Sequence, residues 1–403
     1  MCILESKPMK TPIYLDYNAT TPHDPEVIEA TMPFLTNHFG NPSSSHWYGI
    51  QTKRAVEKAR GQVASLLKCH SVEIIFTSGG TESNNYAIKG VAFGHQDQGN
   101  HIITSQIEHP AVIEVCKFLE ERGFDVTYLP VDSLGMVKLS DVEMAITPQT
   151  VLITIMHANN EVGTIQPIEE ISKLARRHGI VMHTDAAQSA GKISMDINTL
   201  EVDLLSVAGH KLYAPKGVGA LYIRQGVRLE KLLHGAAQEG GKRAGTENVL
   251  EIAGLGKACE IAERDLQKNT KHMIEMRDNL YRGLRETVKD VQLNGHPSER
   301  LPNTLNVSFK GVNAGELLAE IHEMVAVSAG SACHSSEQIS ISPVLQAMKV
   351  EPEWAIGTIR FSVGKFTTAA EINQATQIVS AALIKMRRDR INCHEIYDKA
   401  PHN

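Results

Sequence analysis

One thiol in this chain stands among side chains that would bury it poorly. Cys333 lies in SAGSACHSS, residues 328–336, among small and hydroxylated residues that favour a loop. A structural cysteine behaves as a small hydrophobe and usually has apolar neighbours. A thiol in a loop can instead approach a substrate, and it becomes a nucleophile when it ionises. The sequence therefore indicates a chemical role for Cys333.

A lysine and a carboxylate each follow an apolar run that reads as a buried strand. Lys211 comes shortly after DLLSV (203–207), in a turn rich in glycine and proline, and Asp185 directly follows IVMHT (180–184). A partly desolvated amine can attack a carbonyl carbon. A buried carboxylate is costly without a cationic partner. Taken singly, Lys211 could be an ordinary solvated lysine, and Asp185 could form a surface salt bridge.

Polar residues also follow three other apolar runs. Gly80 and Thr81 come after VEIIFT (72–77), where a helix start could bind a phosphate or Thr81 could simply cap the helix. His109 follows HIIT (101–104), and a lone histidine is usually a surface or core residue. Asn160 is one of two adjacent amides after VLITIM (151–156), and such amides more often cap a loop than form a site.

The combination of these residues is more informative than any one of them. Pyridoxal phosphate needs N–H and hydroxyl donors for its phosphate and a carboxylate for its pyridine nitrogen. It also needs a lysine for its aldehyde and a flat side chain beside its ring. The sequence offers all of these groups at predicted strand ends, so it predicts a pyridoxal phosphate site.

The elements that must position these groups alternate between strands and helices from Val72 to Ile223. This pattern predicts an α/β fold with a mainly parallel, seven-stranded sheet flanked by helices. Ligands of such sheets bind beyond the carboxyl ends of the strands. The predicted strands are VEIIFT (72–77), HIIT (101–104), DVTYLP (125–130), VLITIM (151–156), IVMHT (180–184), DLLSV (203–207) and GALYI (219–223).

A chain of 403 residues is too long for one ordinary core. We expect a large domain at 12–255, whose first segment packs on the smaller domain, and a small α+β domain at 256–390 that carries the Cys333 loop. Residues 1–11 and 391–403 are predicted to be flexible tails. A long amphipathic stretch, 254–287, is expected to connect the domains.

Composition excludes several classes of protein. The net charge of −6 gives no reason to expect nucleic acid or an anionic membrane as a partner. The six cysteines are scattered with no CxxC pair, which predicts reduced thiols and neither a metal site nor a disulfide framework. With no apolar stretch long enough to cross a bilayer, a cytoplasmic location is expected.

Ten motifs in order carry a resemblance to a known family. The chain closely resembles the cysteine desulfurases and selenocysteine lyases, which are class V aminotransferase-like enzymes of the fold-type I pyridoxal phosphate group. The resemblance covers residues 12 to 388. The motifs are YLDYNATTP (14–22), GNPSSSH (40–46), FTSGGTESNN (76–85), EHPAV (108–112), NNEVGTIQP (159–167), HTDAAQ (183–188), GHKLYAPKGVGALY (209–222), KRAGTEN (242–248), SAGSACHSS (328–336) and IRFSVG (359–364).

The resemblance implies catalytic and substrate-binding roles. Lys211 would bind the cofactor aldehyde and then shuttle protons, and His109 would stack on the cofactor ring. The Cys333 thiolate would take sulfur from L-cysteine as a persulfide, leaving L-alanine. Arg360 would clamp the substrate carboxylate, with help from Asn41.

The same resemblance implies further cofactor contacts. Asp185 would pair with the pyridinium nitrogen, while Asn160 and Gln188 would hold the ring hydroxyl and tune the link to lysine. The phosphate would be bound by Gly80, Thr81 and His210, and by Thr246 from the partner subunit of a homodimer.

Three departures from the family pattern leave the substrate open. Ala208 stands where many desulfurases have a phosphate-binding hydroxyl, Gly240 replaces a common arginine, and His334 follows the cysteine where threonine is usual. The first hypothesis is a cysteine desulfurase that feeds sulfur to an acceptor for iron–sulfur clusters or thiolation. The alternatives are a selenocysteine lyase and, more distantly, a non-catalytic scaffold.

Overall fold

The computed structural model describes residues 11–329 and 341–398, with side chains up to residue 390. The chain divides into two compact units. The large unit comprises Asn18–Thr270 and Gly295–Pro302, and the small unit comprises Met1–Tyr17, Lys271–Asn294 and Asn303–Asn403. One boundary of this division, between Thr270 and Lys271, and the predicted boundary at 255/256 both fall within one long helix, α8 (Val249–Thr287).

The large unit is built on a seven-stranded sheet with the strand order β2-β8-β7-β6-β5-β3-β4. All seven predicted strands are present, and only β8 runs antiparallel to its neighbours. The predicted mainly parallel α/β fold is therefore confirmed. The strands are β2 (Ile74–Thr77), β3 (His101–Ser105), β4 (Asp125–Leu129), β5 (Thr150–Thr154), β6 (Val181–Asp185), β7 (Leu204–Ala208) and β8 (Gly219–Ile223).

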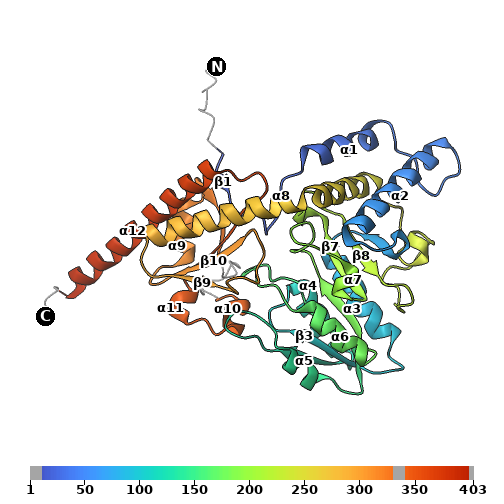
Figure 1. Cartoon of the computed structure of the whole chain (residues 1–403), viewed down its shortest axis with the longest axis horizontal. Coiled ribbons are helices and arrows are strands. Elements are labelled where there is room, and N and C mark those ends of the chain that lie inside the picture. The colour runs from blue at the N-terminus through green and yellow to red at the C-terminus, as the bar shows by residue number, and fades with distance from the viewer. Residues whose placement is uncertain (1–10, 330–340, 399–403) are drawn as a thin grey trace. The chain divides into compact units, whose positions relative to one another are not determined.

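Helices cover this sheet because its strands are apolar on both faces. Every residue of β3, β5 and β7 is buried, and α3 packs against β5, β6, β7 and β8. Figure 1 shows α3, α4 and α6 lying along the sheet. The helices are α1 (Pro25–Thr36), α2 (Trp47–Leu67), α3 (Gly80–Gly94), α4 (Pro110–Glu120), α5 (Leu139–Ala145), α6 (Ile168–Arg177) and α7 (Ile197–Leu200), with 3₁₀ turns η1 (Ser71–Glu73), η2 (Gly209–Lys211) and η3 (Glu239–Gly241).

The small unit contains a four-stranded antiparallel sheet, β12-β13-β10-β9, and a parallel pair, β1-β11. Its core joins the first strand of the chain to α8, α9 and α12, since Ile13 and Leu15 share one apolar cluster with those helices. The elements are β1 (Ile13–Tyr14), β9 (Val291–Asn294), β10 (Thr304–Phe309), α9 (Ala314–Ile321), β11 (Val325–Ala326), β12 (Ser328–Ala329), α10 (Pro343–Ala347), α11 (Pro352–Ala355), β13 (Thr358–Ser362) and α12 (Ala369–Asp398).

The structure differs from the prediction of a flexible C-terminal tail at 391–403. Helix α12 continues to Asp398, so the backbone at the start of that segment is helical. The polar composition that predicts a tail does not stop a helix that has already begun, because extension adds a hydrogen bond for each residue fixed. In the described parts of the chain, no helix has the length and hydropathy needed to cross a bilayer.

Candidate functional site

A tight turn joins β2 to α3 at the edge of the sheet. Gly79 precedes the helix with φ of 148°, a conformation that an L side chain would strain. Gly80 begins the helix, and a Cβ built on it would lie 3.2 Å from the Cβ of Ala208 at the end of β7. The first N–H groups of any helix lack intrahelical partners. Together with the exposed Thr81, they provide donors for an anion.

Asp185 is the last residue of β6 and is only 7% exposed. Its Oδ2 accepts a hydrogen bond from Asn84 Nδ2 at 2.7 Å, and its Oδ1 accepts one from the Ala187 N–H at 2.9 Å. Among the described residues, no lysine or arginine forms an ion pair with it. A buried carboxylate with this surrounding can stabilise a cationic ligand atom.

Lys211 lies in η2, immediately after β7, and its amine is held by the backbone of the segment before α1. Its Nζ donates to the carbonyl oxygens of Asn18 and Ala19, both at 2.7 Å. Gln188 Nε2 donates to the same Asn18 carbonyl at 3.0 Å, and Asn18 Nδ2 donates to the Asn160 carbonyl at 3.1 Å. One buried asparagine thus links three of the predicted site residues.

Two histidines of the site have a lowered pKa. Burial lowers the pKa of His109, with Asp185 opposing and Lys211 adding to the shift, so Asp185 and Lys211 each lie within electrostatic reach of His109. His109 caps α4, where its Nδ1 accepts from the Ala111 N–H at 3.1 Å, and this places the ring proton on Nε2. Burial and the Lys211 charge lower the pKa of His210 to about 4, and its Nδ1 lies 3.2 Å from Thr20 Oγ1.

We call Asn160, Asp185, Gln188, His210 and Lys211 the strand-end site. His109 and Thr81 are not included in this name. They lie near each other, since both line a cavity of about 430 Å³.

Glu108, beside His109, is a buried carboxyl that sequence reasoning did not single out. Its Oε1 accepts from Ser105 Oγ at 2.6 Å and from the Met156 N–H at 2.9 Å. Its Oε2 is buried and has no hydrogen-bond partner among the described residues. Burial raises the pKa of Glu108 to about 8, with a smaller contribution from Asp185, so this side chain is protonated at neutral pH.

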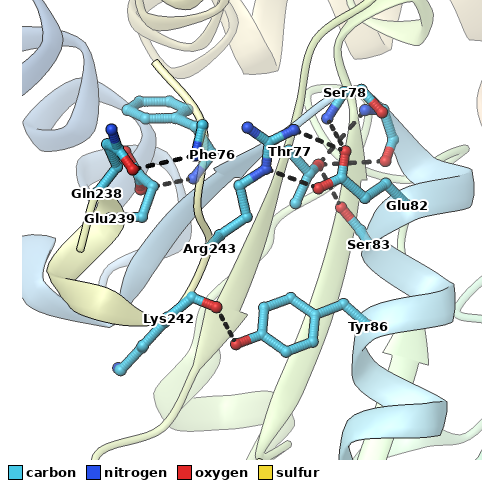
Figure 2. A network of polar contacts seen from close by, with 12 residues as sticks. Phe76, Thr77, Ser78, Glu82, Ser83, Tyr86, Gln238, Glu239, Lys242 and Arg243 are labelled. Atoms are coloured by element: carbon cyan, nitrogen blue, oxygen red, sulfur yellow. Dashed lines mark hydrogen bonds and ion pairs between the residues drawn. The ribbon is translucent and has the colours of Figure 1, made fainter. Parts of the chain in front are cut away.

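A glycine-rich loop, residues 236–246, carries the predicted phosphate ligand Thr246, which is exposed. Figure 2 shows this loop beside β2 and the start of α3, joined to them by polar contacts. Gly240, one of the three departures, has φ of 62°. That backbone conformation suits glycine better than the arginine common in the family.

Of the three remaining predicted residues, the structure describes Arg360 and Asn41. Arg360, on β13 of the small unit, donates from Nη2 to Asp16 Oδ1 at 2.9 Å and to Ser328 Oγ at 3.1 Å. Asn41 is an exposed residue of the large unit whose Oδ1 accepts from the Ser43 N–H at 2.9 Å. Cys333, together with His334, lies outside the described residues.

The donor set of the strand-end site and the α3 turn fits pyridoxal phosphate. The turn supplies anion donors, Asp185 is a buried carboxylate without a cationic partner among the described residues, and Lys211 supplies an amine. The neutral imidazole of His109 supplies a flat face. Each group has the charge and chemical type that the cofactor's corresponding atoms require.

Asn18 and Asn84 were not predicted as site residues, although both belong to motifs of the family resemblance. Asn84 is 1% exposed and donates to Asp185, and its own Oδ1 has no hydrogen-bond partner among the described residues. Asn18 lies between β1 and α1, where no periodic pattern draws attention to it. Only their place in YLDYNATTP and FTSGGTESNN could have identified them.

Comparisons with known proteins identify the family of this chain. Residues 13–375 match the family model for class-V aminotransferases. The chain is 51% identical to the cysteine desulfurase IscS of Dictyoglomus turgidum over 94% of this chain and 96% of that protein. It is 47% identical to the IscS of Methanosarcina thermophila, over 93% of each.

Solved structures give the same result. A NifS-like protein superposes with a TM-score of 0.87 at 40% identity, covering 93% of this chain and 99% of that one. The structure of SspA in complex with cysteine gives a TM-score of 0.78 at 39% identity, covering 88% and 99%. The resemblance inferred from the motifs is confirmed. This chain belongs to the class-V aminotransferase family and, within it, to the cysteine desulfurases.

Proposed function

We propose that this protein is a pyridoxal phosphate-dependent cysteine desulfurase, which converts L-cysteine to L-alanine and retains the sulfur as a persulfide on Cys333. The observation that carries the proposal is the cluster of Lys211, Asp185 and His109 at the strand ends, in a chain of this family. When bound, the cofactor supplies an electron sink that stabilises negative charge at the substrate Cα.

The residues of the strand-end site divide the work of holding the cofactor. Asp185 keeps a proton on the pyridine nitrogen, because its buried carboxylate favours a cation beside it. The first turn of α3, with Gly80, Thr81 and His210, binds the phosphate. Gln188 and Asn160 hold the ring hydroxyl, and both are tied to Asn18.

Lys211 binds the cofactor aldehyde and afterwards moves the proton at the substrate Cα. In this structure its Nζ lies between two carbonyl oxygens, which orient the amine at the end of β7. His109 stacks on the cofactor ring, and its lowered pKa keeps the imidazole neutral at physiological pH. A neutral ring avoids placing a second positive charge beside the pyridinium.

The sulfur is transferred to Cys333. Its thiolate attacks the substrate sulfur, the Cβ–S bond breaks, and the electron pair of that bond stays with carbon, which takes up a proton to give alanine. L-Cysteine and the enzyme thiol thus become L-alanine and the enzyme persulfide. The described cysteines do not suit this role, since burial raises the pKa of Cys69 and of Cys116 to about 12 and raises that of Cys259 as well.

Arg360 binds the substrate carboxylate, with Asn41 assisting, and Thr246 completes the phosphate site of the partner subunit in a homodimer. The persulfide then passes to an acceptor protein for iron–sulfur clusters or thiolation. The free thiols of Cys69, Cys116 and Cys259 support action in the reducing cytoplasm.

The test compares turnover of L-cysteine and L-selenocysteine by the wild type and by Cys333→Ala, with alanine as the measured product. We expect the wild type to use L-cysteine and the variant to lose that activity. Retained selenocysteine turnover in the variant would show that the thiol serves only as the sulfur acceptor. A wild type that ignores L-cysteine but uses L-selenocysteine would identify a selenocysteine lyase and contradict the proposal.

A further inference from the structure

The regular structure of the glycine-rich loop is limited to the short 3₁₀ turn η3 (Glu239–Gly241), so most of the loop needs other contacts to hold its shape. Glu239, Gly240 and Gly241 have φ of 47°, 62° and 76°, values that lie in the left-handed region. Side-chain contacts fasten the loop instead: Glu239 Oε2 accepts from the Phe76 N–H at 2.9 Å, and Tyr86 Oη donates to the Lys242 carbonyl at 2.7 Å. The loop is therefore attached to both β2 and α3.

A third attachment reaches the turn that we assign to the cofactor phosphate. Arg243 makes two contacts with Glu82, from Nε to Oε1 at 2.9 Å and from Nη2 to Oε2 at 3.2 Å. Glu82 Oε2 also accepts from the Ser78 N–H at 2.7 Å. Figure 2 shows the guanidinium directed at this carboxylate, which thus connects the loop to the turn before α3.

Glu82 poses an electrostatic problem for an anion site. It lies in the first turn of α3, and its side chain is only 11% exposed. Burial opposes ionisation, but the hydrogen bonds from Arg243 and Ser78 outweigh it and lower the pKa of Glu82, so the carboxylate is ionised at neutral pH. A fixed negative charge beside a bound phosphate dianion is unfavourable, and salt screens the repulsion poorly when the charge is mostly buried.

Arg243 is placed to offset that charge. Its side chain is 21% exposed, and its bidentate geometry is the strong form of an arginine–carboxylate pair. We propose that Arg243 is a positioning residue for the cofactor phosphate: it compensates the charge of Glu82 in the first turn of α3, whose N–H groups bind the anion. This inference rests on the proposed function, because it assigns the α3 turn to pyridoxal phosphate.

The experiment measures dissociation constants of two ligands on the apo-enzyme, pyridoxal phosphate and pyridoxal, by absorbance titration. Pyridoxal keeps the aldehyde and ring but lacks the phosphate. We expect Arg243→Met to raise the dissociation constant of pyridoxal phosphate by about tenfold or more and that of pyridoxal by less than about threefold. The reason is that the uncompensated charge of Glu82 acts on the phosphate.

Substitutions at Glu82 make the test specific. In the double variant Arg243→Met/Glu82→Gln, pyridoxal phosphate affinity should return to within about threefold of wild type. Glu82→Gln alone should bind pyridoxal phosphate at least as tightly as wild type, because Arg243 is then an uncompensated cation. That single variant keeps the proposal testable if Arg243→Met fails to fold, which circular dichroism would reveal.

Arg60→Met is the matched control, since it removes a different arginine contact to the same loop. It should affect the two ligands alike. Equal weakening of both ligands in Arg243→Met, or no recovery in the double variant, would overturn the inference and leave Arg243 a merely structural residue. A wild-type chain that does not bind pyridoxal phosphate would overturn the proposed function itself.

Discussion

The strand-end site and the glycine-rich loop are held in place by different means. At the strand ends, Asp185 is the last residue of β6 and Lys211 lies just after β7, where the main-chain carbonyls of Asn18 and Ala19 orient its amine. The loop depends on side-chain pairs, including Arg60 with Glu239 at 2.6 Å. We infer that regular structure fixes the groups that bond and move protons, whereas charged pairs adjust the affinity for the phosphate.

The largest expected effect is at the strand-end site. Asp185→Asn keeps the shape of the side chain but removes the charge, so it should lower kcat for L-cysteine by on the order of a hundredfold or more. Thermal unfolding should change little, because the amide oxygen can still accept from Ala187, and Asn84 can turn its Oδ1 toward the new amide N–H. Steady-state kinetics and circular dichroism measure the two quantities. Full activity in Asp185→Asn would mean that this carboxylate has no role at the cofactor.

Removing the loop's ion pair should act on stability instead. Arg60→Met leaves the Glu239 carboxylate, whose side chain is 3% exposed, without its cationic partner. We expect a loss of about 3 kcal/mol in the free energy of unfolding, measured in urea.

The matched control is Lys173→Met, which breaks an exposed pair with Glu169 on α6. It should lower the free energy of unfolding far less than Arg60→Met does, because both members of this pair are exposed and screened by solvent. Equal losses in the two variants would show that burial of the Arg60 pair does not matter and that the loop is held in another way.

The buried carboxyl of Glu108 gives a pH-dependent comparison. Its pKa is raised from 4.5 to about 8, so the folded chain retains a proton that the unfolded chain releases. Stability therefore falls as the pH rises from about 5 to 8. Glu108→Gln mimics the protonated form. Its free energy of unfolding should rise relative to that of the wild type between about pH 5 and 8, by about 1 kcal/mol or more at pH 8.

The difference between variant and wild type is the quantity to measure. Burial lowers the pKa of His157 to about 4, and this has the opposite pH dependence: it lowers stability as the pH drops below about 6.5. Subtracting the wild-type curve removes that contribution. A flat difference for Glu108→Gln would mean that this carboxyl is ionised in the folded chain.

The smallest effect concerns the missing phosphate ligand at position 208. Ala208→Ser adds a hydroxyl at the end of β7, close to Gly80 in the phosphate turn. One new hydrogen bond should lower the dissociation constant of pyridoxal phosphate by about two- to tenfold and leave that of pyridoxal unchanged. Titration of the apo-enzyme measures both constants. Weaker binding would show that the turn is too crowded for a hydroxyl.

Local sequence patterns predicted the sheet correctly, because its strands follow the apolar runs, and the ends of the same runs drew attention to the residues proposed for the strand-end site. Asp185 and Lys211 are conspicuous because they carry charges just after β-branched segments. The seven strands follow from the same runs, with end points that shift by one or two residues. The cofactor prediction needed only the types of residue at those positions.

The remaining contacts could not be predicted because they join distant parts of the chain. Glu82 and Arg243 are 161 residues apart, and nothing local to either one specifies its partner. Asn18 meets Gln188 across a separation of 170 residues, from a segment with no periodic pattern. The protonated state of Glu108 depends on three-dimensional burial, which its motif EHPAV does not reveal.

Covalent attachment of the cofactor tests the central claim most directly. The holoenzyme is reduced with borohydride, digested, and analysed by peptide mass spectrometry. The account predicts a pyridoxyl phosphate modification on Lys211 alone, and none in Lys211→Ala. Modification of another lysine, or an unmodified Lys211 in active enzyme, would contradict it.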